Sequence, residues 1–214
     1  MRAFIESALM AVSHRYHAQV ARRYWQSVEA THTDMSGESF DFYAAHIAEL
    51  LGPPAQCGRV LDHGAGDGEI GMRLLQLGYD VEFSEFAPHF IERIRESGHR
   101  CYESNAVPEA AFDTVFSNNA IFYVHPSRLT AEVRWLLGRV RVGGRLLLLD
   151  VPTLQRMHLL GGSPFSLFAK RMTGVCQPQA GGFFVDEARM TREFPRLRLT
   201  PSWCEYRAHL ELRR

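Results

Sequence analysis

The stretch 59–68, RVLDHGAGDG, decides how this chain should fold. An apolar pair is followed by an acid, Asp62, and then by glycines at positions 64, 66 and 68. A strand that ends in such a turn presents backbone N–H groups, because glycine has no side chain to cover them. Residues 69–77 (EIGMRLLQL) favour a helix whose amino end would face a ligand above the sheet. The stretch therefore predicts a strand, a glycine turn and a helix that together hold a nucleotide-type cofactor.

Downstream of this unit, strands and helices alternate, which is typical of a parallel sheet with helices on both faces. The expected strands are 58–63, 79–85, 100–104, 112–117 and 145–151, and the expected helices are 67–77, 88–98 and one after Pro126. Helical potential continues at 153–160, 164–172 and 186–194. The last two extended segments, 196–204 and 207–213, are joined by too few residues for a crossover helix, so they should pair antiparallel.

The part before the glycine stretch reads differently, since it lacks strands. Residues 1–30 carry apolar side chains at helical spacing, and 42–51 (FYAAHIAELL) predicts a second helix that ends at Gly52. We therefore expect an N-terminal helical lid over residues 1–55 and a core domain over 56–214. The predicted fold is α/β: a seven-stranded, mostly parallel, doubly wound sheet with a C-terminal antiparallel hairpin.

Two cofactor classes compete for the glycine turn. The glycines at 66, 68 and 71 spell GDGEIG, which fits the dinucleotide fingerprint of an NAD-dependent oxidoreductase. Asp62 argues against that interpretation, because it would bring negative charge toward an anionic pyrophosphate. The same acid suits a cofactor with a free ammonium group. The expected terminal hairpin also disfavours the dinucleotide folds, which end in another parallel unit.

The order apolar–apolar–Asp–x–Gly–x–Gly–x–Gly resembles motif I of the class I S-adenosylmethionine-dependent methyltransferases. Three further segments resemble this family in the right order: EFAPHF (85–90), SNNAIFYVHP (117–126) and RVGGRLLLLD (141–150). Together the resemblances cover residues 59–151. They imply the family's Rossmann-like fold, S-adenosylmethionine as cofactor with S-adenosylhomocysteine as product, and transfer of a methyl group to an oxygen, nitrogen or carbon acceptor.

The resemblance also assigns cofactor contacts. Glu85, about 20 residues after the first glycine, would accept both ribose hydroxyls, and Asn118 would hold the amino end of the cofactor. Where the family has Asp-Ala beside the adenine amino group, this chain has Asn105-Ala106, and an Asx turn is an equal alternative for the asparagine. The full cofactor set is Asp62, Gly64, Ala65, Gly66, Glu85, Phe86, Asn105, Ala106, Asn118 and Ala120.

Residues for the acceptor and for catalysis are less well marked. The family often has Glu-His where this chain has Phe122-Tyr123. His125 is a candidate general base, with a histidine at the start of a helix as the alternative. Tyr16, Tyr24, Trp25 and Tyr123 are expected to cover or line the acceptor pocket, although each aromatic taken singly is more often a core residue.

The composition argues against several classes of binding partner. Lysine plus arginine and aspartate plus glutamate both number 24, so no net field attracts nucleic acid, and no Asn-Pro-Pro-Tyr tetrapeptide follows the fourth strand to hold a flipped base. We see no membrane span, no signal peptide and no metal-ligand spacing, and the four cysteines lack a CxxC pair. The sequence thus predicts a cytoplasmic small-molecule methyltransferase. A protein that binds the S-adenosyl ligand without catalysis, as a sensor or partner subunit, is the alternative.

Overall fold

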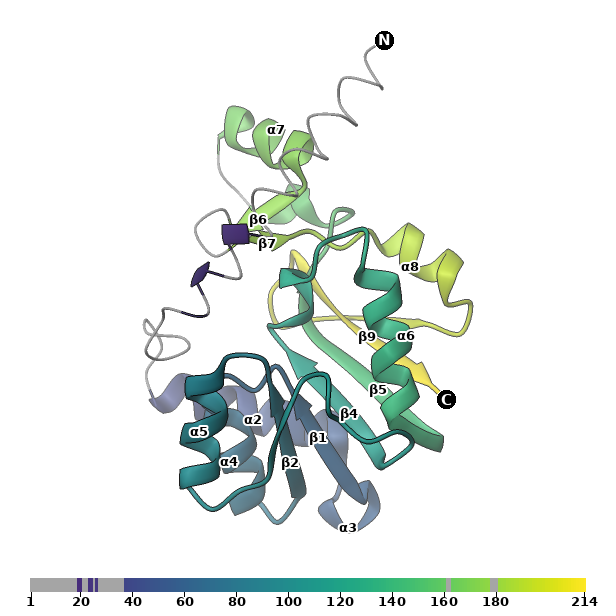
Figure 1. Cartoon of the computed structure of the whole chain (residues 1–214). Helices are drawn as coiled ribbons and strands as arrows, with labels where there is room; N and C mark the ends of the chain where they lie inside the picture. Colours follow the sequence, from purple (N-terminus) through teal and green to yellow (C-terminus); the bar gives the residue numbers. More distant parts are fainter. Residues whose placement is uncertain (1–18, 21–22, 25, 27–36, 161–162, 178–180) are drawn as a thin grey trace. The chain divides into compact units, whose positions relative to one another are not determined.

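The computed structural model describes residues 19–20, 23–24, 26, 37–160, 163–177 and 181–214 (Figure 1). The chain divides into two compact units, each assembled from separate segments. We call residues 28–118, 135–147 and 213–214 the glycine-loop unit. We call residues 1–27, 119–134 and 148–212 the hairpin unit. Each is described here in its own right.

A seven-stranded sheet runs in the order β3-β2-β1-β4-β5-β9-β8 within the described residues. Its strands are β1 (Arg59–His63), β2 (Asp80–Glu85), β3 (Cys101–Glu103), β4 (Phe112–Asn118), β5 (Val140–Pro152), β8 (Arg198–Pro201) and β9 (Arg207–Arg213). β1 pairs in parallel with both β2 and β4, β2 pairs in parallel with β3, and β8 pairs antiparallel with β9. The predicted mostly parallel sheet with a terminal antiparallel hairpin is confirmed.

Within the described residues, the helices that lie wholly in the glycine-loop unit are α2 (Gly37–Leu51), α3 (Pro54–Cys57), α4 (Glu69–Gln76) and α5 (Pro88–Glu96). α2 packs on α4, and α4 and α5 both pack along β2 (Figure 1). The core of this unit is fully buried and apolar, because β1 and β4 lie inside the sheet and present side chains on both faces. Its large, fully buried members include Leu61, Leu74, Phe83, Phe90, Ile94, Phe112 and Phe116.

Shorter elements dominate the hairpin unit. These are the 3-10 turns η1 (Ile121–Tyr123) and η2 (Met157–Leu160), the helices α7 (Pro164–Thr173) and α8 (Glu187–Glu193), and the strands β6 (Val175–Gln177) and β7 (Gly182–Phe183). α6 (Leu129–Arg139) belongs to both units. Side chains cap two of the helices: Ser163 accepts from Ser166 N at 3.2 Å, and Asp186 accepts from Ala188 N at 3.0 Å.

Several expectations about the elements need correction. α2 begins at Gly37 instead of Phe42, and α3 forms where a stop was expected, because proline is well tolerated in the first turn of a helix. β5 begins at Val140 instead of residue 145, so Gly143 lies inside the strand, at φ +85°. The antiparallel pair β6–β7, introduced above, was not predicted.

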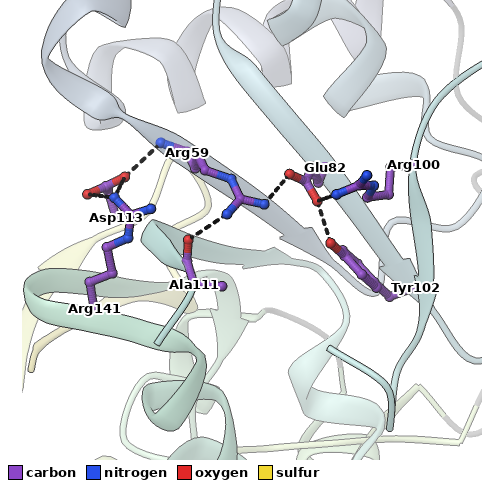
Figure 2. A network of polar contacts seen from close by, with 7 residues as sticks. All are labelled: Arg59, Glu82, Arg100, Tyr102, Ala111, Asp113 and Arg141. Carbon is purple, nitrogen blue, oxygen red and sulfur yellow. Dashed lines mark hydrogen bonds and ion pairs between the residues drawn. The ribbon is translucent and has the colours of Figure 1, made fainter. Parts of the chain in front are cut away.

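A polar network joins the strands of the glycine-loop unit around Arg59, the first residue of β1 (Figure 2). The Arg59 guanidinium pairs with Glu82 and donates to Ala111 O at 3.3 Å. Tyr102 also donates to Glu82, at 2.6 Å. The network includes Arg100, Asp113 and Arg141 as well. These contacts fix β1 against its neighbours at the start of the strand, away from the glycine turn at its end.

Part of the N-terminal prediction lies outside the described residues. Residues 19–20, 23–24 and 26 are helical, in agreement with a helix in this region, whereas Tyr16 and Trp25 are not described. The division into a lid (1–55) and a core (56–214) stays a prediction. None of the helices in the described ranges combines the length and the apolarity needed to cross a membrane.

Candidate functional site

The glycine turn has the backbone geometry that the sequence predicts. Gly64, Gly66 and Gly68 all have positive φ, at +72°, +59° and +84°. The conformation of Gly68 favours glycine, and a Cβ there would also crowd Ile94, whose Cγ1 would lie 3.1 Å away. Gly64 N and Ala65 N donate to Ser84 O of β2 at 2.9 and 3.2 Å. The turn is thus bound to the end of the neighbouring strand before α4 begins.

Glu85 closes this turn from β2. Its side chain is buried, and its carboxylate accepts three backbone hydrogen bonds: from Gly66 at 2.8 Å, from Phe86 at 2.6 Å and from Ala87 at 3.1 Å. Burial raises the pKa of Glu85, and the three N–H donors act in the opposite direction. The carboxylate therefore holds the glycine turn against the start of α5. An anionic carboxylate has about four acceptor positions, so one remains for a ligand hydroxyl.

Asp62 has a different environment, although it lies on the adjacent strand. The residue is 4% exposed, and no hydrogen-bond donor or cation among the described residues contacts its carboxyl group. Burial, followed by the charges of Glu85 and Asp67, raises the pKa of Asp62 to about 8. A buried carboxyl group without a partner is costly, which makes Asp62 a candidate ligand contact.

Asn118 is the second buried polar group of this kind. It ends β4, is 8% exposed, and has no hydrogen-bond partner on either Oδ1 or Nδ2 within the described structure. Since Asp62 is in register with Phe116 of β4, Asn118 lies two residues beyond Asp62 toward the same carboxyl edge. The two strand ends together offer an acid and an amide that no group in the described residues satisfies.

The remaining predicted cofactor residues surround these strand ends more loosely. Phe86 is 48% exposed after β2, which leaves its ring available to a ligand. Asn105 and Ala106 are exposed in the turn after β3, where Ala106 N donates to Glu103 O at 2.8 Å. The structure thus brings Asp62, the glycine turn, Glu85 and Asn118 together at consecutive strand ends of one unit, and it leaves Asn105 on the surface.

The other predicted residues belong to the hairpin unit. Ala120 precedes η1, and the Tyr123 ring lies 4.5 Å from that of Phe122. His125 Nδ1 accepts from Ser127 N at 3.1 Å and lies 2.7 Å from Ser127 Oγ, just before α6. This contact matches the role of a histidine at the start of a helix. Tyr24 is half-buried in a helical stretch.

Sequence reasoning missed a buried ion pair in the hairpin unit. Asp150 is fully buried in β5, and its carboxylate pairs with Arg207 of β9 and accepts from Ser202 Oγ at 2.7 Å. Arg207 also donates to Asn119 Oδ1. Asn119 and Asp150 are non-glycine residues that both have φ +53°, so one guanidinium holds two left-handed backbone positions. The signal in the sequence was an acid at the end of an apolar run, which requires a buried partner.

Comparison with known proteins gives structural matches only. No family model matches the sequence, and no curated protein does either. Among solved structures, a SAM-dependent methyltransferase from Leishmania major matches with a TM-score of 0.63 at 16% identity, over 91% of this chain and 82% of that one. Magnesium protoporphyrin IX methyltransferase from Synechocystis PCC 6803, with bound SAH, matches with a TM-score of 0.54 at 15% identity, over 96% and 97%.

The mitomycin 7-O-methyltransferase MmcR also matches, with a TM-score of 0.57 at 17% identity, over 81% of this chain. The match spans 53% of MmcR, about half of its length. These likenesses agree with the strand order and the terminal hairpin described above. The chain therefore has the fold of the class I S-adenosylmethionine-dependent methyltransferases.

Proposed function

We propose that the protein binds S-adenosylmethionine and transfers its methyl group to a small molecule. One observation carries the proposal: two buried polar groups flank a glycine turn that Glu85 holds in place. The Asn118 amide has no hydrogen-bond partner among the described residues, and the charges that act on the Asp62 carboxyl group are those of other acids. An ammonium group would satisfy the acid, and an amide can both donate to a carboxylate and accept from an ammonium. This combination suits the amino-acid end of the cofactor.

The same residues disfavour a dinucleotide. A pyrophosphate needs donors and positive charge, whereas the strand ends provide the acids Asp62 and Glu85. A ribose hydroxyl can reach the remaining acceptor position of Glu85, and Phe86 can cover the adenine. Support for the whole assignment also comes from the fold, since the matching structures include magnesium protoporphyrin IX methyltransferase with bound SAM and with bound SAH.

In the proposed reaction, the main task of the protein is to position the cofactor and the methyl acceptor. The cofactor, when bound, supplies a methyl group already activated by the sulfonium. The residues of the glycine-loop unit hold it in a fixed orientation, and orientation alone can provide much of the rate. For an acceptor that needs a base, we propose His125. Ser127 N donates to Nδ1 of His125, so the neutral ring carries its proton on Nε2. To act as a base, Nδ1 must therefore give up the hydrogen bond from Ser127 N and accept the proton of the methyl acceptor instead.

The acceptor and the location belong to the proposal as well. We propose a small-molecule acceptor because the matching structures include a magnesium protoporphyrin IX methyltransferase and a mitomycin 7-O-methyltransferase, and because the chain has no net charge to attract nucleic acid. All four cysteines are free thiols, which supports a cytoplasmic location. Tyr16, Tyr24, Trp25 and Tyr123 remain our proposed acceptor contacts.

Calorimetry tests the proposal directly. We expect the purified protein to bind S-adenosylhomocysteine and S-adenosylmethionine and to give no heat with NAD. Glu85→Ala should weaken S-adenosylhomocysteine binding by about 2–3 kcal/mol, because a charged acceptor is lost and the glycine turn is released. Glu103→Ala is the matched control, since Glu103 is exposed on β3 in register with Glu85. Binding of NAD without either S-adenosyl ligand would refute the assignment.

A further inference from the structure

The groups that surround Asp62 include no cation among the described residues. The acids near Asp62 are Glu85 of β2 and Asp67 of the turn before α4. The charge of Asp62 also acts on the Cys101 thiol of β3, whose pKa it raises. α4 presents Gly71, whose added Cβ would lie 2.9 Å from Asp62 Oδ2. On its own strand the next residue is His63, and burial lowers the pKa of His63 to about 4, so that ring is neutral.

The two buried acids are not equivalent. Glu85 accepts three backbone N–H groups, which favour its ionised form. Asp62 accepts none from the described residues, and both acids near it carry the same sign of charge. When two buried carboxyl groups share one region, the one with fewer donors keeps the proton.

We propose that Asp62 carries a proton in the ligand-free protein and releases it to solvent when a cationic S-adenosyl ligand binds. The balance is one carboxylic acid plus one ligand cation giving one carboxylate–cation pair plus one proton. This inference rests on the proposed function, which supplies the ligand. Two consequences go beyond the proposed function. The affinity for the ligand depends on pH through Asp62 alone, and the site selects positively charged over uncharged adenosyl compounds.

The environment of Asp62 supports this sequence of events at neutral pH. Burial, together with Glu85 and Asp67, raises the pKa of the free carboxyl group to about 8. An ammonium group within a few ångströms favours the carboxylate and lowers that pKa again. Below about pH 7.5, where the ligand amine is still protonated, each unit of pH should therefore raise the affinity about tenfold.

Calorimetry can count the proton. S-adenosylhomocysteine is titrated into the full-length protein at pH 7.0 in phosphate, imidazole and Tris buffers, whose ionisation enthalpies differ. The slope of observed heat against ionisation enthalpy gives the protons released, and we expect about one per ligand. 5′-Methylthioadenosine, which lacks the amino-acid arm, should release none. Asp62→Asn should abolish the release, and Asp80→Asn, an exposed aspartate at the start of β2, should leave it unchanged.

Each outcome has a clear meaning. Failure to bind S-adenosylhomocysteine at all overturns the proposed function. Binding with no proton release and with an affinity that is constant from pH 6 to 7.5 overturns the proton exchange alone. Release with 5′-methylthioadenosine, or release that persists in Asp62→Asn, overturns the assignment to Asp62. Should Asp62→Asn fail to fold, infrared difference spectra of the wild type decide, since a protonated carboxyl band must disappear as the ligand binds.

Discussion

Single side chains at the strand ends set the pH behaviour of the free protein. Asp62 and His63 are adjacent on β1, both are buried, and both are held in their uncharged forms near neutral pH. Their contributions to stability oppose each other. The pKa of Asp62 rises to about 8 on folding, so its contribution is complete below about pH 4 and is lost as the pH rises to 8.

The contribution of His63 to folding stability has the opposite pH dependence. Its pKa falls to about 4 in the folded protein, so the stability of the neutral ring is lost as the pH falls from about 6.5 to 4. Between pH 4 and 6.5 the two slopes largely cancel. Above pH 6.5 the slope of Asp62 remains.

We therefore predict that the ligand-free protein loses stability from pH 6.5 to 8, by about 1.4 kcal/mol per pH unit for each proton held only by the folded state. Asp62→Asn should flatten this decline, because asparagine does not titrate. Urea unfolding at half-unit pH steps measures both proteins. An unchanged decline in Asp62→Asn would assign the effect to another group, and Asp80→Asn controls for the loss of a surface charge.

At the scale of elements, the packing of α4 on β2 depends on one glycine. A Cβ at Gly71 would lie 2.2 Å from Phe83 Cε1, whereas a Cβ at Gly138 of α6 would meet nothing within 4 Å. We predict that Gly71→Ala destabilises the protein by about 1–3 kcal/mol through overpacking. Gly138→Ala should stabilise it by about 0.5–1 kcal/mol through helix propensity. Urea unfolding measures the stability of both variants. Equal changes in stability would contradict the close packing of α4 on β2.

Gly71 also explains why the sequence matches the dinucleotide fingerprint. The third glycine of that fingerprint serves close packing of helix on strand, and the same packing occurs here between α4 and β2. The glycine spacing 66, 68, 71 therefore indicates a strand–turn–helix geometry that both cofactor classes share. Asp62 is the residue that distinguishes the two classes, because a carboxyl group suits an ammonium and not a pyrophosphate.

The buried ion pair of the hairpin unit supports a second prediction at this scale. Arg207→Met would leave Asp150 charged and buried without its partner, at a cost of about 3–5 kcal/mol. Adding Asp150→Leu should recover part of that loss, since an apolar pair needs no desolvation. Arg198→Met on the exposed face of β8 is the control and should change stability by less than about 0.5 kcal/mol. Failure of the double variant to recover would show that the pair acts through Asn119 or Ser202.

For the whole molecule, the parallel framework was predictable and the irregular parts were not. Each helix and strand from Arg59 to Glu103 lies within about two residues of its expected bounds, because apolar periodicity and glycine or proline stops agree there. The pair β6–β7 was missed because two- and three-residue strands give no periodic signal. The Asp150–Arg207 pair was missed because its members are 57 residues apart, and no local rule links them.

The N-terminal residues provide the test at this scale. We predict that deletion of residues 1–30 leaves a folded protein, since the glycine turn and its contacts lie after Arg59, but weakens S-adenosylhomocysteine binding and abolishes methyl transfer. Circular dichroism and calorimetry measure folding and binding. Limited proteolysis is the complementary experiment: cleavage sites within 1–30 should become protected by S-adenosylhomocysteine. Equal cleavage with and without ligand would indicate a helix of the core.

The interleaving of the two units limits how such a gene can change by recombination. The chain passes from one unit to the other at 27/28, 118/119, 134/135, 147/148 and 212/213, and β5 itself contains one of these junctions. No single crossover between two related genes can therefore exchange one unit whole. On the proposed function, a new acceptor preference would have to arise by point substitution or by insertions within one segment. Among the described residues of the hairpin unit, the longest stretch outside the seven-stranded sheet lies between β5 and β8 (153–197), and insertions there would disturb the sheet least.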